Sequence, residues 1–333
     1  MKKRQITIKD IAKALHISPS TVSRSLADHP DISQETKNIV NAYAREHKYK
    51  PNALALSLRT NNTKTIGVIL PQIVHYFFSS VLSGIEDEAE KGGYRVIICQ
   101  SNENYEKEVK GAQALLEARV CGVLASVAKT TTIYNHFQEL IDSDIPMVFF
   151  DRIAPDRVVV DDYAGVCSAV EYLIRSGCRR IAFFGSPSHL AISNNRRMGY
   201  EDALRKNGLP VDKELIKICD NYTEALRLTP ELLSLPNRPD AFFAVNDETA
   251  IGVLNVVKAK GLRIPDEVSI CGFTNNSLAE VSDPLLTSVD QHGYELGAIA
   301  MRLLIERLNG VRDGDRIVSK IIKTNLVVRQ STR

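Results

Sequence analysis

Two spacings of apolar residues alternate along most of this chain. From Thr65 onward, short runs rich in Val, Ile, Leu and Phe are separated by longer stretches in which apolar residues recur every three or four positions. The short runs favour buried strands and the wider spacing favours amphipathic helices. We expect strands at 66–70, 95–99, 122–126, 147–150, 158–160, 181–184, 215–219, 241–245 and 268–271, and helices at 81–90, 108–118, 169–175, 198–205, 250–259 and 296–308.

The alternation of strands and helices predicts the fold class of this region. Strands that alternate with helices form a parallel, doubly wound α/β sheet. The pattern runs twice and divides near Asp161, so we expect a core of two lobes.

The first 50 residues carry only the helical spacing. Thr7 and Asp10 resemble a capping box that opens a first helix. Ser18 and Pro19 suit the start of a second, and Ser33 suits the cap of a third. The apolar stripes expected to pack together are Ile8, Ile11, Ala12 and Leu15, then Val22 and Leu26, then Ile39, Val40, Tyr43 and Ala44.

Two short helices joined by a tight turn predict an all-α helix-turn-helix head. The second helix leaves Ser20, Thr21, Ser23 and Arg24 on its outward side, where they could enter the major groove of double-stranded DNA. Any small three-helix bundle shows similar capping, so a plain bundle remains an alternative.

Residues 51–64 form a connector between the head and the core. Pro51 to Arg59 is rich in Ala and Leu, which are strong helix formers. A helix shorter than about 12–15 residues is marginal alone in water, so we expect this one to form only when something packs on it. The alternative is a small amphipathic connector packed on the core.

Charge is distributed unevenly between these regions. Residues 1–64 contain 12 Lys or Arg and 5 Asp or Glu, a balance of +7, whereas the whole chain carries only +2. A basic head on an acidic body is typical of a polyanion-binding module, although it could also be a solvated surface.

Several function classes lack their signatures. No run of about 18 apolar residues and no signal-like start occurs, so we expect a cytoplasmic protein without a membrane partner. The six cysteines are scattered and favour buried thiols over a metal site or disulfides. Neither a phosphate-binding glycine motif nor a G-x-S-x-G sequence is present, so we expect no cofactor and no enzymatic activity.

Polar residues follow the expected strands of the core. Ligands of open parallel sheets bind beyond the carboxyl ends of the strands. Facing strand ends of two lobes would form a cleft with short polar groups, suited to a neutral or anionic hydroxylated molecule. The polar residues selected on this basis are Ser126, Asp151, Arg152, Asn221, Asn246, Asp247 and Thr274. Each could instead be a simple turn former.

The head closely resembles that of the lactose-repressor (LacI/GalR) family of bacterial transcription regulators. The matching segments are Thr7 to Ala12, Ser18 to Arg24 and Tyr49 to Ala53. The resemblance implies that Pro19, Ser20 and Arg24 face base edges and that Thr21, Ser23 and Asn52 hold phosphates. It also implies that Leu58 wedges into the minor groove. Lys9 and Ala55 complete the expected DNA-binding set, and Leu56 departs from the family, which usually carries Arg or Gln there.

The core also resembles this family, whose core is similar to periplasmic sugar-binding proteins. Its matches are Arg196-x-x-Gly199-Tyr200, Asn246-Asp247 and the segment from Gly261 to Ser269. The resemblance implies that Arg196 and Asp247 hold the ligand and that Tyr76 and Phe77 stack on it. Arg196 could equally be a surface charge. Thr274 stands where many members carry Asp, and Leu190 and Asn221 stand where the purine-binding branch has Arg and Phe, so a purine effector is not expected.

These observations together predict a DNA-binding transcriptional regulator of the repressor type. We expect a homodimer that binds operator DNA and responds to a small sugar or sugar acid. The expected ranges are the head at 1–50, the hinge helix and linker at 51–64, and the core at 65–333. Within the core we expect lobe one at 65–162 plus 290–322 and lobe two at 163–289 plus 323–333. The competing hypotheses are a solute-binding protein without a DNA role and an enzyme on a doubly wound fold.

Overall fold

The computed structural model describes residues 6–49, 63–152, 157–188, 190–310 and 319–333. The chain divides into two compact units, Met1–Lys64 and Thr65–Arg333. The expected hinge helix, with Asn52, Ala55 and Leu58, lies outside the described residues.

The described part of the first unit contains three helices, α1 (Ile8–Ala14), α2 (Pro19–Leu26) and α3 (Gln34–Glu46). Each begins at a residue whose side-chain oxygen accepts a hydrogen bond from a backbone N–H of the first turn. These residues are Thr7, Ser18 and Ser33. Ile11, Ala12, Val22, Val40 and Ala44 form the buried core between the helices.

One residue of the predicted α3 stripe is misplaced. Ile39 is 51% exposed, so its assignment to the packing face was wrong. The buried stripe of α3 is narrow because Val40 and Ala44, four positions apart, lie one above the other and Ile39 falls on its edge. The sequence also gave no sign that Lys37 is buried, with its Nζ 2.8 Å from Asp28 Oδ1 in the loop after α2.

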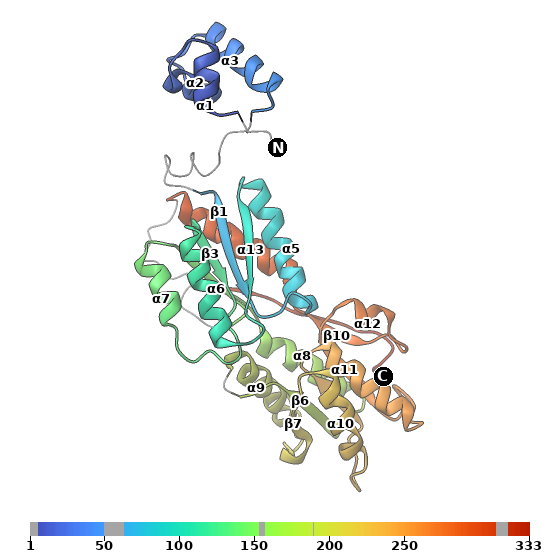
Figure 1. Ribbon diagram of the computed structural model, residues 1–333. Helices are drawn as coiled ribbons and strands as arrows, with labels where there is room; N and C mark the ends of the chain where they lie inside the picture. Colours follow the sequence, from blue (N-terminus) through green and yellow to red (C-terminus); the bar gives the residue numbers. More distant parts are fainter. Residues whose placement is uncertain (1–5, 50–62, 153–156, 189, 311–318) are drawn as a thin grey trace. The chain divides into compact units, whose positions relative to one another are not determined.

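Lobe one of the second unit is built on a six-stranded parallel sheet. Its strands, β1 (Thr65–Leu70), β2 (Arg95–Gln100), β3 (Gly122–Ala125), β4 (Met147–Phe150), β5 (Arg157–Val160) and β11 (Ser319–Ile322), lie in the order β11-β5-β4-β3-β1-β2. Helices α5 (Tyr76–Lys91) and α13 (Gly293–Leu308) pack on one face, and α6 (Tyr105–Glu117) and α7 (Asn135–Asp142) on the other (Figure 1).

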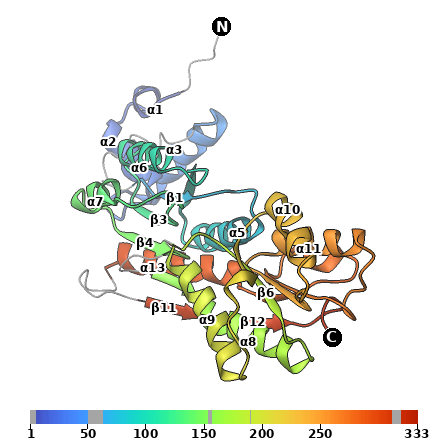
Figure 2. The same cartoon turned by 90° about the horizontal axis from the view of Figure 1, so that it is seen from below.

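Lobe two repeats this plan. Its strands, β6 (Ile181–Gly185), β7 (Ile216–Ile218), β8 (Ala241–Ala244), β9 (Ser269–Thr274), β10 (Thr287–Asp290) and β12 (Asn325–Val327), lie in the order β12-β10-β9-β8-β6-β7, and only β12 is antiparallel to its neighbour. Helices α8 (Asp162–Arg175) and α9 (Ala191–Lys206) cover one face, and α10 (Tyr222–Leu233) and α11 (Asp247–Ala259) the other (Figure 2). A 3-10 turn (Lys213–Leu215) and the short helix α12 (Ser277–Val281) complete the lobe.

The chain passes between the lobes three times. It leaves lobe one after β5, returns between β10 and α13, and leaves again between β11 and β12. Helix α13 therefore belongs to lobe one although lobe two precedes it, and its Leu296, Ala300, Met301 and Leu304 lie in the core of lobe one.

Helices α5 and α13 cross at two glycines. A Cβ at Gly84 would lie 2.0 Å from the carbonyl oxygen of Tyr294, and one at Gly297 would lie 1.9 Å from that of Val81. No side chain fits at either position, so the close approach of the two helix backbones depends on both glycines.

All nine expected strands lie on observed ones, but the helices begin earlier than expected. For example, α5 begins at Tyr76, five residues before the apolar spacing that predicted it, and α8 begins at Asp162, seven before. Strands β10, β11 and β12 were not predicted. Within the described chain, no helix is both long and apolar enough to span a membrane.

Candidate functional site

The outward side of α2 presents the predicted base-contacting residues. Pro19, Ser20 and Arg24 are exposed, whereas Val22 and Ser25 are buried on the opposite side. A helix turns about 100° per residue, so positions 19, 20, 23 and 24 lie within one arc of the helix surface. The helix therefore presents a short hydroxyl- and cation-bearing surface, the dimensions of which suit a DNA groove.

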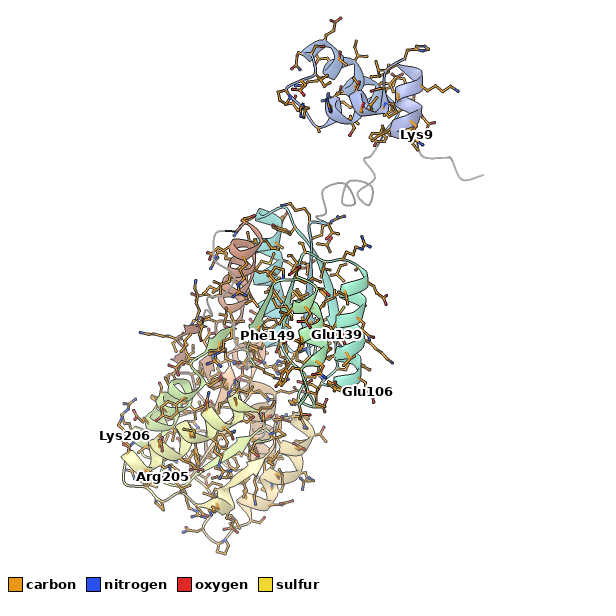
Figure 3. The ribbon with its side chains drawn as sticks, turned by 90° about the vertical axis from the view of Figure 1, so that its left-hand side faces the viewer. Lys9, Glu106, Glu139, Phe149, Arg205 and Lys206 are labelled. Atoms are coloured by element: carbon orange, nitrogen blue, oxygen red, sulfur yellow. The ribbon has the colours of Figure 1, made fainter. Side chains whose placement is uncertain are left out.

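Capping places the hydroxyl groups at the start of α2. The Ser18 hydroxyl accepts from the backbone N–H of Thr21 at 3.0 Å and lies 2.7 Å from the Ser20 hydroxyl. Thr21 and Ser23 are half-buried at the edges of the same surface. Lys9, labelled in Figure 3, is exposed on the neighbouring helix α1.

Arg24 is available to a partner. Its Nη1 lies 3.9 Å from Asp31 Oδ2, and both side chains are more than half exposed. Exposed ion pairs of this length contribute little to stability, so the guanidinium can leave Asp31 for a guanine edge at small cost.

A cavity of about 270 Å³ lies between the carboxyl ends of the two parallel sheets. This is the position that the doubly wound topology favours for a ligand. The lining residues come from both lobes: Gln72, His75, Phe77, Phe78, Glu103, Lys129, Asp151, Arg152, Ser186, Leu190, Ile192, Arg196, Asp220, Asn221, Val245, Asn246, Glu248, Thr274 and Gln291.

Seven of the ten expected effector-binding residues line this cavity. They are Phe77, Asp151, Arg152, Arg196, Asn221, Asn246 and Thr274. The other three, Tyr76, Ser126 and Asp247, are not among its lining residues.

Each of these three lies elsewhere for a different reason. Tyr76 is the first residue of α5 and lines two separate surface depressions beside the cavity. Ser126 is completely buried directly after β3. Asp247 is also completely buried, where its carboxylate accepts hydrogen bonds from the Ser288 hydroxyl and the backbone N–H of Asn276. It thus holds the segment that follows β9, and burial raises its pKa to about 7 despite these hydrogen bonds.

Arg196 is fixed at the cavity wall by three contacts. Its Nε donates to Asp162 Oδ1 at 2.7 Å, its Nη1 donates to the carbonyl oxygen of Val245 at 2.9 Å, and its guanidinium lies over the Phe273 ring at 4.1 Å. Arg196 is nine-tenths buried, so the alternative of a surface charge does not hold. Such a rigid guanidinium presents fixed N–H donors to a bound oxygen.

Arg152 is held in the same way in lobe one. Two nitrogens donate to the two carboxylate oxygens of Glu103 at 2.7 and 2.9 Å, and Nη1 also donates to the carbonyl oxygen of Val127 at 2.6 Å. Burial opposes the charged form of Glu103, but the hydrogen bonds and charge of Arg152, together with those of Lys129, outweigh it and lower the pKa of that carboxyl. The Nε of Arg152 is buried and makes no hydrogen bond within the described residues, although the carboxylate of Asp151 lies 3.6 Å away.

Two titratable groups of the wall are affected mainly by burial. Burial raises the pKa of Asp151 to about 6, although Arg152 Nε lies 3.6 Å from its carboxylate. Burial also lowers the pKa of His75, with smaller effects from Lys129 and Arg152, so this imidazole is neutral near pH 7. Its Nδ1 is buried and has no hydrogen-bond partner in the described structure, as expected of an atom that awaits a ligand or water.

Two cavity residues cap helices as well. Asn221 Oδ1 accepts from Glu224 N at the start of α10, and Asn246 Oδ1 accepts from Thr249 N at the start of α11. Their expected roles as turn formers and as lining residues therefore coexist. Each of these two residues at a strand end therefore caps the helix that follows and also lines the cleft.

The expected effector-binding set omitted several lining residues. The positional rule picks out Gln72 and Asp220, each two residues beyond a strand, although the expected set did not include them, and Glu103 stands three residues beyond β2. Lys129 lies four residues beyond β3, and its role depends on the long loop that follows. No group of metal-ligating side chains occurs in the parts of the chain that the structure describes.

Comparison with known proteins agrees with this arrangement. Residues 7–52 match the family "Bacterial regulatory proteins, lacI family", and residues 170–332 match the family "Periplasmic binding protein-like domain". The HTH-type transcriptional repressor CytR of Escherichia coli (strain K12) is 33% identical over 98% of this chain and 96% of its own length. The ribose operon repressor of Halalkalibacterium halodurans is 32% identical over 98% of this chain and 97% of its own.

A solved structure shares the whole architecture. The transcriptional regulator CelR in complex with cellobiose is 25% identical, with a TM-score of 0.75 over 98% of this chain and 100% of that one. The helix-turn-helix unit, the two-lobed core and the full-length similarity to repressors favour a regulator over a solute-binding protein without a DNA role. This chain belongs to the lacI family of bacterial regulatory proteins and is a DNA-binding transcriptional regulator.

Proposed function

We propose that this regulator is a repressor that binds operator DNA as a homodimer. A small hydroxylated effector, a sugar or sugar acid bound between the two lobes, would raise or lower its affinity for the operator. The observation that carries the proposal is the cavity between facing strand ends, with its fixed guanidinium groups, amides and an aromatic ring. The names of two similar proteins support it, because one regulates a ribose operon and the other binds cellobiose.

The cavity residues have different roles in binding the effector. Arg152 and Arg196 present immobile N–H donors to hydroxyl oxygens, Asn221, Asn246 and Thr274 offer short polar groups, and the apolar rings of Phe77 and Phe78 cover the ligand. No turnover is expected, because these groups hold a ligand and none forms a nucleophile–base pair.

The DNA-binding residues make two kinds of contact, one to bases and one to the phosphate backbone. Pro19, Ser20 and Arg24 meet base edges, while Lys9, Thr21 and Ser23 contact the phosphate backbone. Asn52 of the connector adds a phosphate contact, and Ala55 and Leu58 add contacts in the minor groove, where an apolar wedge kinks the duplex. Two heads are needed to bind two half-sites, which is why a homodimer is proposed. Binding to chromosomal DNA places the protein in the cytoplasm.

The effector would act by shifting a conformational equilibrium. To move the connector from 1:99 to 99:1 between its two states, the effector must prefer one state by about 5.5 kcal/mol. Closure of the lobes around the ligand can provide that preference only if the ligand contacts both lobes. The cavity meets this requirement, since Arg152 and Arg196 come from different lobes.

An operator gel shift across a panel of sugars tests the proposal. At least one sugar should change operator affinity of the wild type, and Arg196→Lys should abolish that change while it leaves operator binding without sugar intact. Lysine cannot reproduce the planar fork that reaches Asp162 and Val245 together.

The neighbouring residue provides the control. Arg197 lies on the same helix, but it is exposed and pairs with Glu201. Arg197→Lys should respond to the sugar as the wild type does. If no sugar alters operator binding, the effector proposal is wrong. If Arg196→Lys responds as the wild type does, the role given to Arg196 is wrong.

A further inference from the structure

An ion pair joins the two lobes across the cavity. Lys129, in the loop after β3 of lobe one, places its Nζ 2.7 Å from Oδ2 of Asp220, which follows β7 of lobe two. Both residues line the cavity, and their side chains are 32% and 14% exposed. The pair is therefore part of the cavity wall and is partly shielded from solvent.

The loop that presents Lys129 is held by two carboxylates, those of Glu103 and Glu108. The backbone N–H of Lys129 donates to Glu103 Oε2 at 2.7 Å, and the backbone N–H of the preceding residue, Ala128, donates to Glu108. Glu108 is completely buried and also accepts from Thr131 Oγ1 at 2.6 Å and contacts His136 Nε2 at 3.0 Å. So many contacts fix the position from which the lysine side chain extends.

The opposite side is fixed as well. The carbonyl oxygen of Asp220 accepts from Asn246 Nδ2 at 2.8 Å, and its N–H donates to Glu224 Oε2 at 3.4 Å. Lys129 and Asp220 thus meet because both backbones are held in place.

Every cation among the described lining residues is matched by a carboxylate. Lys129 pairs with Asp220, Arg152 with Glu103, and Arg196 with Asp162, each at 2.7 Å. Asp151 and Glu248 add two more lining carboxylates. The wall consequently has no surplus positive charge with which to balance an acidic ligand, and burying an unbalanced carboxylate is costly.

We propose that the Lys129–Asp220 ion pair determines which ligand charge the cavity accepts. While Asp220 holds the lysine ammonium, the cavity selects a neutral hydroxylated ligand and rejects the corresponding acid. This inference rests on the proposed sugar effector and narrows it. Lys129 is the cation whose charge can be released, because Arg152 and Arg196 are nine-tenths buried whereas Lys129 is a third exposed and extends on a flexible stem.

Isothermal titration of the full chain with matched sugars tests the inference. The probes are glucose with glucuronate, galactose with galacturonate, ribose with ribonate and cellobiose with cellobionate. The wild type should bind the neutral member of at least one pair at least tenfold more tightly than the acid. Asp220→Asn removes the carboxylate that pairs with the ammonium and should shift this ratio at least tenfold toward the acid.

The reciprocal variant tests the other half of the pair. Lys129→Met leaves the Asp220 carboxylate without its lysine, so affinity for glucosamine or galactosamine should rise at least tenfold relative to glucose or galactose. Acid binding should not improve in this variant.

Matched controls come from ion pairs that do not line the cavity. Asp212→Asn breaks the Arg180–Asp212 pair, which is exposed to a similar degree, and Lys206→Met breaks the Lys206–Glu171 pair at the outer side of lobe two (Figure 3). Neither should change the preference for ligand charge.

The outcomes separate the two proposals. Tight binding of an acid by the wild type, or an unchanged ratio in Asp220→Asn, overturns the role of the ion pair and leaves the sugar effector standing. Failure of every sugar, neutral or acidic, to bind overturns the sugar effector and with it this inference.

Discussion

Asp151 combines burial with a left-handed backbone, at φ +65°, in the cavity wall. Arg152, its nearest cation, is already engaged by both oxygens of Glu103 and cannot fully balance a second carboxylate. Burial therefore prevails and raises the pKa of Asp151 to about 6, whereas an unfolded Asp titrates near 3.9.

This shift makes stability depend on pH. Between about pH 4 and 6 the folded chain binds more protons than the unfolded chain, so the contribution of Asp151 to the free energy of unfolding falls as pH rises. A pKa raised by about two units lowers the free energy of unfolding by about 3 kcal/mol at pH values above this window. Asp151→Asn should raise the free energy of unfolding by up to that amount at pH 7 and by almost nothing at pH 4, as measured by urea unfolding.

Asp144→Asn is the matched control for this prediction. Asp144 also has a positive φ, of +58°, but it is exposed. It should show no such difference between the two pH values. An equal effect of Asp151→Asn at pH 4 and pH 7 would contradict the assigned cause.

Part of the cavity wall could be predicted from the sequence, residue by residue. The rule that polar groups follow strand ends found Asp151, Asn221 and Asn246, because it depends only on the direction of parallel strands. It also selected Asp247, one position further along, which a helical turn directs into the protein instead. Neighbouring positions differ in orientation, and that orientation depends on the helix start, which the apolar spacing did not locate.

Among the secondary-structure elements, the helix starts were the least predictable part of the fold. The first turns of α8 and α11 carry acidic and small residues, which interrupt the apolar spacing, and the first turn of α5 carries Phe77 and Phe78, which line the cavity. Strands β10, β11 and β12 are only three or four residues long, with at most two apolar residues each, too short a run to predict a strand without its pairing partner. The other strands could be predicted from their apolar runs alone, because helices cover both faces of each sheet.

The crossing of α5 and α13 gives a prediction at this scale. Gly297→Ala would place a methyl group against the carbonyl oxygen of Val81, which is backbone and cannot rotate away. Overpacking typically costs about 1–3 kcal/mol, and a backbone clash belongs at or above the upper end. The free energy of unfolding, measured in urea, should fall by about 3 kcal/mol or more.

A second helical glycine supplies the comparison. A Cβ at Gly111 in α6 would meet only the side chain of Cys99, with the Cβ at 3.1 Å and the Sγ at 3.9 Å. Gly111→Ala should change the free energy of unfolding by no more than about 1 kcal/mol, since alanine also favours helix. If the two variants are equally stable, the helices can separate and the glycines are not required.

For the whole molecule, the division of charge separates the two binding activities. The first 64 residues carry a balance of +7 within a chain of +2, so phosphate contacts concentrate there. Binding of DNA releases counterions, and 6–10 phosphate contacts lower affinity by about 10³–10⁵ between 50 and 200 mM salt.

Operator affinity should therefore fall steeply with salt, while sugar affinity of the same full-length chain should change less than about twofold. Fluorescence anisotropy with labelled operator and calorimetry with sugar at matched salt concentrations measure the two. A flat salt dependence of operator binding would contradict the assignment of the head as the DNA-binding unit.

The three passages of the chain between the lobes also determine the order in which the protein can be completed. Lobe one needs α13 and β11, which the ribosome makes only after all of β6 to β10. At about 5–20 residues per second, on the order of ten seconds separate the synthesis of β5 from that of β11. During this interval the apolar face that α13 will cover is open, so a nascent chain exposes its first lobe while its second is already closing, and that face is where a chaperone would be needed.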